Sequence, residues 1–174
     1  MNNANINLVK VAVLDANTLQ RLSRQTFIES YSLGNTSENV QDYIESSFNE
    51  LKLIEEINNR YSQFYFAILN STPIGYIKIN FAQSQTDLKD SKSLEIERIY
   101  VLKEFQGRNI GQMLIEEAYK IARQTNLDYV WLGVWERNSR GIKFYERNEF
   151  TQFANHSFKF GSEVQTDVLM KRLI

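Results

Sequence analysis

The sequence contains no cysteine, which excludes disulfide bonds, zinc sites built from thiolates and a cysteine nucleophile. It contains a single histidine, His156. A metal site with several histidine ligands is therefore impossible, and a Ser-His-Asp triad would have to use this one residue. We expect no metal site.

Long apolar runs are also missing, because no segment approaches the length that a membrane-spanning helix needs. Residues 1–10 show neither an apolar stretch nor a region resembling a signal-peptide cleavage site. The net charge is −1, and general nucleic-acid binding requires a basic field that this balance does not supply. We expect a cytoplasmic protein that binds neither membranes nor nucleic acid.

The totals are those of an ordinary globular protein. The chain has 174 residues, of which 43% are hydrophobic and 24% are charged. This length suits one domain with a substantial core. No repeat, linker or low-complexity run divides the sequence, so a single domain over residues 1–174 is predicted.

Hydrophobic patterns predict an order of strands and helices typical of a mixed α/β (α+β) sheet. Asp15 or Asn17 is expected to cap the first helix and Asn49 a later, short one. Residues 83–93 are polar and flexible in composition. The expected strands are 8–13, 64–69, 74–81, 94–101, 128–134, 150–158 and 164–173, and the expected helices are 17–31, 38–48, 50–57, 110–122 and 139–148.

The stretch EFQGRNIGQML, residues 104–114, stands between a predicted strand and a predicted helix. The first turn of a helix has free N–H groups and partial positive charge. Gly107 and Gly111 allow close backbone approach, and Arg108 adds a fixed charge. Together these features predict a cradle for phosphates. The alternative is a tight strand–helix turn that merely needs glycine.

The spacing excludes two familiar phosphate loops. No Gly-Lys-Ser/Thr follows, as a Walker loop requires, and Gly-x-x-x-Gly is not the dinucleotide fingerprint. The segment instead resembles the acetyl-CoA-binding motif of the GNAT superfamily of N-acetyltransferases, Gln/Arg-x-x-Gly-x-Gly/Ala. Asn109 replaces the first glycine of that motif, and asparagine tolerates left-handed backbone angles better than most residues.

A second element of the same family is an Asn followed by a helix that ends in a Tyr. The chain matches it with Asn138 and Tyr145, while Glu149-Phe150 stands where the family has Gly-Phe. The resemblance is strong over residues 94–150 and looser elsewhere. It implies one GNAT-like domain, in which a mixed seven-stranded central sheet is flanked by helices and has a splayed cofactor-binding edge. It also implies direct acetyl transfer, and GNAT proteins are often homodimers.

The resemblance also implies roles for particular residues. Tyr145 would donate a proton to the departing thiolate, and Asn138 would contact the cofactor or cap its helix. Val101 or Ile99 would polarise the thioester carbonyl through its backbone N–H. The implied acetyl-CoA-binding set is Ile99, Tyr100, Val101, Gln106, Gly107, Arg108, Asn109, Ile110, Gly111, Gln112, Asn138 and Tyr145.

A carboxylate is needed to remove the proton of the amine. Glu95 and Glu97 lie two apart on one predicted strand and share a face. By resemblance Glu97 is the first candidate for the catalytic base and Glu95 the alternative. Both could instead be salt-bridged surface groups. His156, alone on a late strand, is more typical of a structural residue.

Stretches across the chain resemble the PaiA-type polyamine acetyltransferases, among them FIESYSLGNTSENVQDYI and HSFKFGSEVQTDVLMKR. This implies spermidine or spermine as the acceptor. Tyr31 and Phe27 could form cation–π walls or belong to the core. Carboxylates for the acceptor side could come from Glu29, Glu38, Asp42 and Glu45. The alternatives are a protein lysine or N-terminus, a small amine drug, or a silent CoA-binding regulatory module.

Overall fold

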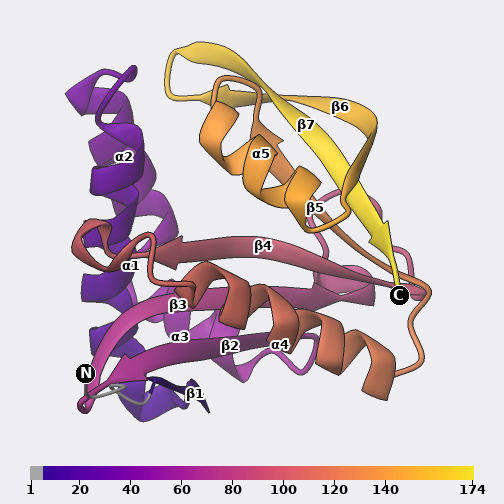
Figure 1. Cartoon of the computed structure of the whole chain (residues 1–174). Coiled ribbons are helices and arrows are strands. Elements are labelled where there is room, and N and C mark those ends of the chain that lie inside the picture. Colours follow the sequence, from indigo (N-terminus) through magenta and orange to yellow (C-terminus); the bar gives the residue numbers. More distant parts are fainter. Residues whose placement is uncertain (1–5) are drawn as a thin grey trace.

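The computed structural model describes residues 6–174, and its strands form one mixed sheet in the order β1-β2-β3-β4-β5-β7-β6 (Figure 1). The predicted seven-stranded sheet is confirmed. The strands are β1 (Ile6–Lys10), β2 (Ser62–Leu69), β3 (Thr72–Phe81), β4 (Ser93–Val101), β5 (Tyr129–Trp135), β6 (Thr151–Phe160) and β7 (Glu163–Leu173). The helices are α1 (Ala16–Tyr31), α2 (Ser37–Ser47), α3 (Glu50–Asn58), α4 (Ile110–Gln124) and α5 (Ser139–Arg147).

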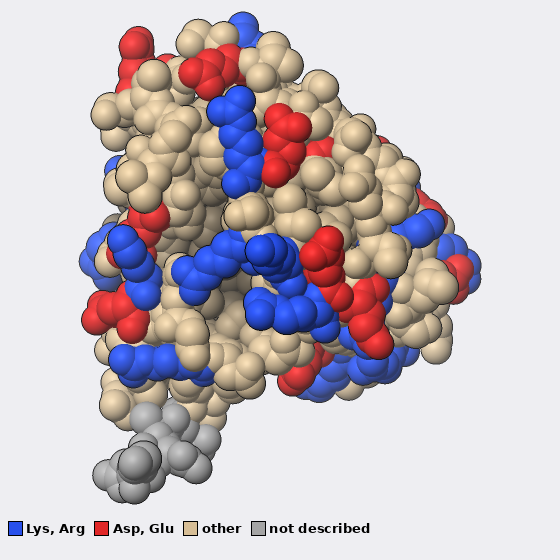
Figure 2. Space-filling view, turned by 45° about the horizontal axis from the view of Figure 1, so that its top comes forward, with Lys and Arg blue, Asp and Glu red and all other residues tan. Residues whose placement is uncertain are grey.

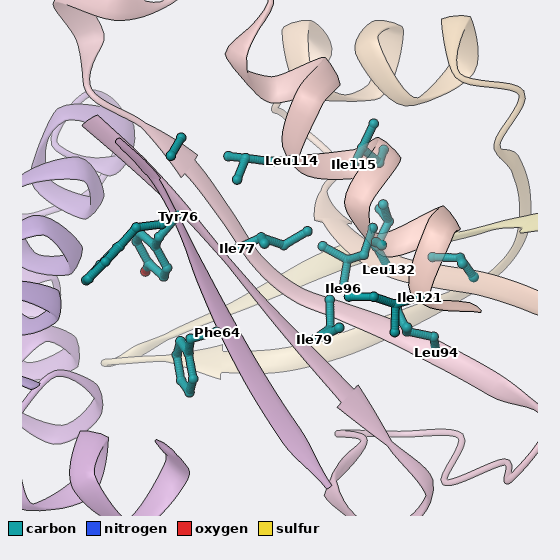
Figure 3. Packing of buried hydrophobic residues seen from close by; sticks show 14 of the residues in the cluster. Phe64, Tyr76, Ile77, Ile79, Leu94, Ile96, Leu114, Ile115, Ile121 and Leu132 are labelled. Carbon is teal, nitrogen blue, oxygen red and sulfur yellow. The ribbon is translucent and has the colours of Figure 1, made fainter. Parts of the chain in front are cut away.

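The core lies on both faces of the central strands, because alternate side chains point to opposite sides. Figure 3 shows Ile77 and Ile96 directed toward Leu114 of α4, whereas Phe64 and Tyr76 point to the opposite side, toward the N-terminal helices. All five side chains are buried. Burying one such apolar side chain contributes about 1.5–3 kcal/mol to the free energy of unfolding. The two layers of buried side chains therefore stabilise the central sheet.

The sheet splits between its two central parallel strands. β4 and β5 pair only from Ser93↔Tyr129 to Glu95↔Trp131. Beyond these pairs β4 continues along β3, and β5 continues along β7. In Figure 1 the two strands start side by side near the C-terminus and then diverge. The expected splayed edge is thus present.

The long β6–β7 hairpin closes one side of the split by packing its tip on α2. Asn39 of α2 accepts a hydrogen bond from the Ser162 N–H at 3.3 Å. Gln165 donates to Asn35 at 2.7 Å. Gly161 forms the turn with a φ of +59°, and a Cβ there would lie 1.9 Å from the Asn39 side-chain oxygen.

Two local expectations were wrong. The first strand ends at Lys10 rather than residue 13, because a 3₁₀ turn follows at Val13–Asp15. Asp15 precedes α1 but makes no side-chain cap to it, and instead accepts from the Ala12 N–H at 2.9 Å. Asn49 does cap α3, accepting from the Lys52 N–H at 2.9 Å.

The segment expected to be flexible, residues 83–93, is pinned by one side chain. Gln85 is only 2% exposed. Its amide nitrogen donates to the carbonyl oxygens of Asp90 and Ser93, and its oxygen accepts from the indole nitrogen of Trp131. The prediction of flexibility from polar composition was wrong, because these polar groups form hydrogen bonds with one another rather than with water.

Among residues 6–174, none of the helices combines the length and the apolar composition needed to span a bilayer. The sequence-based prediction for residues 1–10 falls partly outside the described residues.

We predict that Gly161→Ala destabilises the fold more than Gly107→Ala. Both glycines have positive φ, +59° and +80°, but a Cβ at Gly107 would meet nothing within 4 Å. The left-handed backbone alone costs alanine about 1–2 kcal/mol, and Gly161→Ala must also displace Asn39. Urea denaturation of both variants measures the difference. Equal losses would contradict the close packing of the hairpin on α2.

Candidate functional site

The divergence of β4 and β5 leaves a cleft of about 900 Å³. The end of β4, the loop before α4, the end of β5, helix α5 and the end of α1 line it. Most residues of the predicted cofactor set line this cleft, namely Ile99, Tyr100, Val101, Gln106, Gly107, Asn109, Ile110, Gly111, Gln112, Asn138 and Tyr145. The first turn of α4 therefore lies at the same cleft as the tyrosine of α5.

The loop before α4 presents free backbone donors. The first helical bond runs from the Met113 N–H to the Asn109 carbonyl at 3.1 Å. Within the part of the chain that the structure describes, the N–H groups of residues 107–112 have no intramolecular acceptor. Such donors, combined with the helix dipole, are suited to an anion such as a phosphate.

Both departures from the family motif occupy left-handed backbone. Asn109 has a φ of 66° and ψ of 10°, so asparagine adopts the left-handed backbone angles that the sequence analysis allowed for it. Glu149, in place of the second family glycine, also has a φ of 66°. Asparagine is one of the residues that tolerate this region, whereas glutamate adopts it less readily.

Gln106 holds the loop to its neighbours on both sides. Its side-chain nitrogen donates to the Val101 carbonyl at 3.0 Å, and its oxygen accepts from Arg140 at 3.0 Å. Arg108, predicted to face the phosphates, instead stacks over Phe105 at 5.2 Å and does not line the cleft. Its role in cofactor binding stays a prediction.

The cleft is also lined by four cationic residues that the sequence analysis did not identify, namely Lys103, Arg137, Arg140 and Arg147. Figure 2 shows Lys and Arg side chains gathered around a hollow on the face of the molecule that carries α4 and α5. Arg137 and Arg140 flank Asn138 in the sequence, and this proximity was the available signal. These charges favour an anionic ligand in the cleft.

Tyr145 and Asn138 both reach the cleft from α5. Tyr145 makes edge-on ring contacts with Phe144 and Phe150. Burial raises the pKa of its hydroxyl, which accepts and donates no hydrogen bond among the described residues. Asn138 caps α5, accepting from the Gly141 N–H at 2.9 Å. The capping alternative for Asn138 is therefore confirmed, and its place in the cleft leaves cofactor contact open to it.

The two candidate bases lie close together but are not among the residues that line the cleft. The β3–β4 register runs from Lys78↔Arg98 to Ile79↔Ile96, so Glu97 is the extra residue of a β-bulge. The Asn80 side chain donates to both Glu95 and Glu97. Their expected shared face is thus confirmed, but neither is an exposed surface carboxylate.

Glu97 is the centre of a buried ion cluster. Lys78 lies 2.6 Å from its carboxylate and Arg98 3.1 Å, and both cations also pair with Glu56 of α3. Burial alone would raise the pKa of Glu97, but Arg98 and Lys78 outweigh it and lower the pKa to about 2. A carboxylate held in this way is a weak base.

Glu95 has the opposite environment. It is 3% exposed and accepts hydrogen bonds from both the backbone and the hydroxyl of Thr86. Burial raises its pKa despite these bonds. The position of either carboxylate as catalytic base stays a prediction, but a raised pKa suits that task better than a lowered one.

Other sequence candidates take separate places. Of the four acidic residues proposed for the acceptor side, Glu29 alone lines the cleft, where it also accepts from the Lys103 N–H at 2.8 Å. Tyr31 lines the cleft as well and stacks on Phe27 at 4.5 Å. His156 does not line it, and pairs with Asp87 at 3.1 Å.

Comparison with known proteins gives a consistent family match. A model of the acetyltransferase (GNAT) family matches residues 23–150. A protein of Lactobacillus delbrueckii subsp. lactis, named "Uncharacterized N-acetyltransferase in pepI 3'region", is 36% identical over 169 residues, which is 97% of this chain and 98% of that one. The "Spermidine N(1)-acetyltransferase" of Thermoplasma acidophilum is 28% identical over 149 residues, covering 83% and 88% of the two chains.

Two solved structures have similar folds. The crystal structure of PaiA N-acetyltransferase from Thermoplasma acidophilum in complex with coenzyme A has a TM-score of 0.82 at 26% identity, and covers 98% of this chain and 99% of that one. A GCN5-related N-acetyltransferase from Rhodopseudomonas palustris has a TM-score of 0.77 at 15% identity, with 100% and 99% covered. The second likeness concerns the fold alone.

We predict that Glu97→Gln lowers the free energy of unfolding by about 3 kcal/mol at pH 7, because it removes one of the two carboxylates that pair with the buried Lys78 and Arg98 and leaves them only Glu56. The folded-state pKa of Glu97 lies below the unfolded value of about 4.3. Its stabilisation is therefore complete above that value and fades as the pH falls toward about 2. The difference between the two proteins should shrink across that window.

Chemical denaturation at several pH values measures this difference. The control is Glu55→Gln, which removes an exposed carboxylate of α3 beside Glu56. A Glu97→Gln variant as stable as this control at pH 7 would show that the ion cluster does not stabilise the fold.

Proposed function

The chain belongs to the GNAT family of N-acetyltransferases and uses acetyl-CoA as its acetyl donor, and we propose that the acceptor is a primary amine of a polyamine such as spermidine. The observation that carries the proposal is the cleft itself, in which the N–H groups of residues 107–112 and the Tyr145 hydroxyl have no hydrogen-bond partner within residues 6–174. The Thermoplasma acidophilum relative named as a spermidine acetyltransferase supports the choice of acceptor. A cytoplasmic location and a homodimer stay predictions from the sequence.

Phosphate groups fit the N-terminus of α4. The N–H groups of residues 107–112 supply donors, and the side chains of Lys103 and Arg140 add positive charge at the same cleft. Beyond Glu95, β4 has no strand partner on its β5 side among the described residues. Its backbone there is suited to pair with the amide groups of an extended pantetheine arm, as an added strand would.

Acetyl-CoA supplies the acetyl group as an activated thioester. The backbone N–H of Val101 or Ile99 donates to the acetyl carbonyl oxygen and polarises it. Transfer forms the bond from the amine nitrogen to the acetyl carbon while the carbon–sulfur bond breaks. Tyr145 donates its proton to the departing sulfur, and its raised pKa keeps the phenol protonated until that moment.

A carboxylate takes the proton that the amine loses. Glu95 suits this role better than Glu97, because burial raises the pKa of Glu95 whereas ion pairs lower that of Glu97 to about 2. Neither lines the cleft, so the proton travels through water. Holding the amine beside the thioester supplies much of the remaining rate.

We predict that Gly111→Asp weakens acetyl-CoA binding by at least about tenfold, or 1.4 kcal/mol, without destabilising the fold. A carboxylate in the first turn of α4 repels phosphate, yet it interacts favourably with the helix dipole. A Cβ at this position meets only Phe144, at an ordinary 3.5 Å.

Calorimetric titration with acetyl-CoA and thermal denaturation test the two halves of this prediction. Gly111→Ala is the matched control, since it adds the Cβ without the charge. Unchanged acetyl-CoA binding in the Gly111→Asp variant would show that the phosphates of acetyl-CoA do not bind at the N-terminus of α4.

We predict that Tyr145→Phe lowers kcat by about 10² or more, as expected for loss of a general acid, while acetyl-CoA binding changes little. Release of free CoA thiol is measured with spermidine, spermine, putrescine, a lysine peptide and a small amine drug. The control is Tyr129→Phe. The hydroxyl of Tyr129 donates a hydrogen bond to Asp90 at 2.7 Å, and Tyr129 does not line the cleft.

The same panel tests the acceptor and the base. Glu95→Gln should slow transfer beyond any loss of stability. Release of CoA thiol with spermidine or spermine supports the polyamine assignment. Release only with another amine would identify that amine as the acceptor instead. Measurable acetyl-CoA binding without transfer to any amine would favour the silent CoA-binding module.

A further inference from the structure

The C-terminal hairpin carries a carboxylate that the mechanism above does not use. In the β6–β7 register, His156 stands directly opposite Asp167. Both residues belong to the C-terminal stretch that resembles the polyamine acetyltransferases. Asp167 is also opposite Trp135 of β5, so it lies at the strand that forms one wall of the split.

His156 already has another partner. The buried Gln85 and the bonds from Thr86 to Glu95 fix the loop before β4 against the sheet. This holds Asp87 at 3.1 Å from the His156 ring nitrogen. The side chain of Asp167 takes part in no hydrogen bond or ion pair among residues 6–174. It is therefore a half-buried carboxylate that the rest of the fold does not satisfy.

Asp167 does not itself line the cleft, but it lies beside residues that do. Its carboxylate oxygen would lie 3.3 Å from a Cβ at Gly133, so the missing side chain at Gly133 makes room for it. The neighbouring aromatic residues, Trp135 and Tyr31, line the acetyl-transfer cleft and pack at 6.2 Å from each other. Aromatic faces beside a carboxylate favour a bound cation.

With Asp167 ionised, the local charge is negative whether or not His156 is protonated. The titratable groups around Asp167 are His156 on β6, Asp87 on the loop before β4 and Tyr31 on α1. Burial raises the pKa of Asp167 to about 6, against the opposing effect of His156. Asp167 is thus ionised at pH 7 to 8, and a cation placed beside it would gain a partner.

We infer that Asp167 binds the charged, non-reacting amine of the acceptor, and so makes the site prefer acceptors that carry a second ammonium group. The inference rests on the proposed function and adds to it the residue that binds the second positive charge of the acceptor. A monoamine of similar length would reach the thioester without this contact. Asp167 acts here as a specificity residue and takes no proton from the reacting amine.

The test compares acceptors matched in length. The catalytic efficiency, kcat/KM, is measured with 1,4-diaminobutane and with n-butylamine for the wild type, Asp167→Asn and Glu163→Gln. The last variant removes an exposed carboxylate of the same strand. The preference for the diamine should fall at least tenfold in Asp167→Asn, with the n-butylamine and acetyl-CoA parameters nearly unchanged, and should persist in Glu163→Gln.

The pH dependence supplies a readout that a structural role would not move. Since Asp167 is protonated below about pH 6, the wild-type preference for the diamine should weaken between pH 8 and pH 5.5. The preference of Asp167→Asn should stay flat over the same range. Equal diamine preference in the wild type and Asp167→Asn would overturn the inference and leave the acetyltransferase assignment intact.

A binding measurement keeps the inference testable without turnover. Spermidine is titrated calorimetrically into the protein saturated with CoA, and Asp167→Asn should bind it at least tenfold more weakly. Spermidine binding that Asp167→Asn weakens, without transfer to any amine, would reject the proposed function while supporting the role of Asp167. No spermidine binding to the wild type, or equal binding to both proteins, would overturn that role.

Discussion

The pairing of β4 with β5 ends at Glu95↔Trp131, and the site depends on this early end. If the parallel pairing continued, the backbone N–H and C=O groups of β4 would be hydrogen-bonded to neighbouring strands on both sides. Because the strands separate, the edge of β4 faces a cleft instead. The α4 N-terminus and Tyr145 on α5 both reach this cleft, so the proposed phosphate site and the tyrosine lie at one place in the fold.

A buried ion cluster joins β4 to β3 and α3. At the bulge of β4, Glu97 lies among Lys78 and Arg98, which also pair with Glu56 of α3. Breaking such a buried cluster is costly, even though the intact cluster gains little over apolar packing. The cluster holds the bulged strand against α3, next in sequence to the backbone groups of β4 proposed to meet the thioester.

Local sequence signals were reliable where the backbone alone decided the outcome. Asn109 was expected to keep the left-handed geometry of a motif glycine, and its φ of 66° agrees. The order of strands and helices follows from hydrophobic periodicity in the same way. Residues 83–93 were misjudged, since their polar composition indicated flexibility whereas Gln85 bonds them to the sheet.

The sequence by itself determined the order of elements, the glycine-rich loop ahead of α4 and the tyrosine on α5, because each depends on residues close together in the chain. Only the tertiary structure decided where β4 and β5 part and which charges meet. Arg140 reaches Gln106 across 34 positions, and Arg98 reaches Glu56 across 42. Such partners are chosen by packing, and the pKa values of Glu95, Glu97 and Asp167 follow from the burial and the charges that this packing creates.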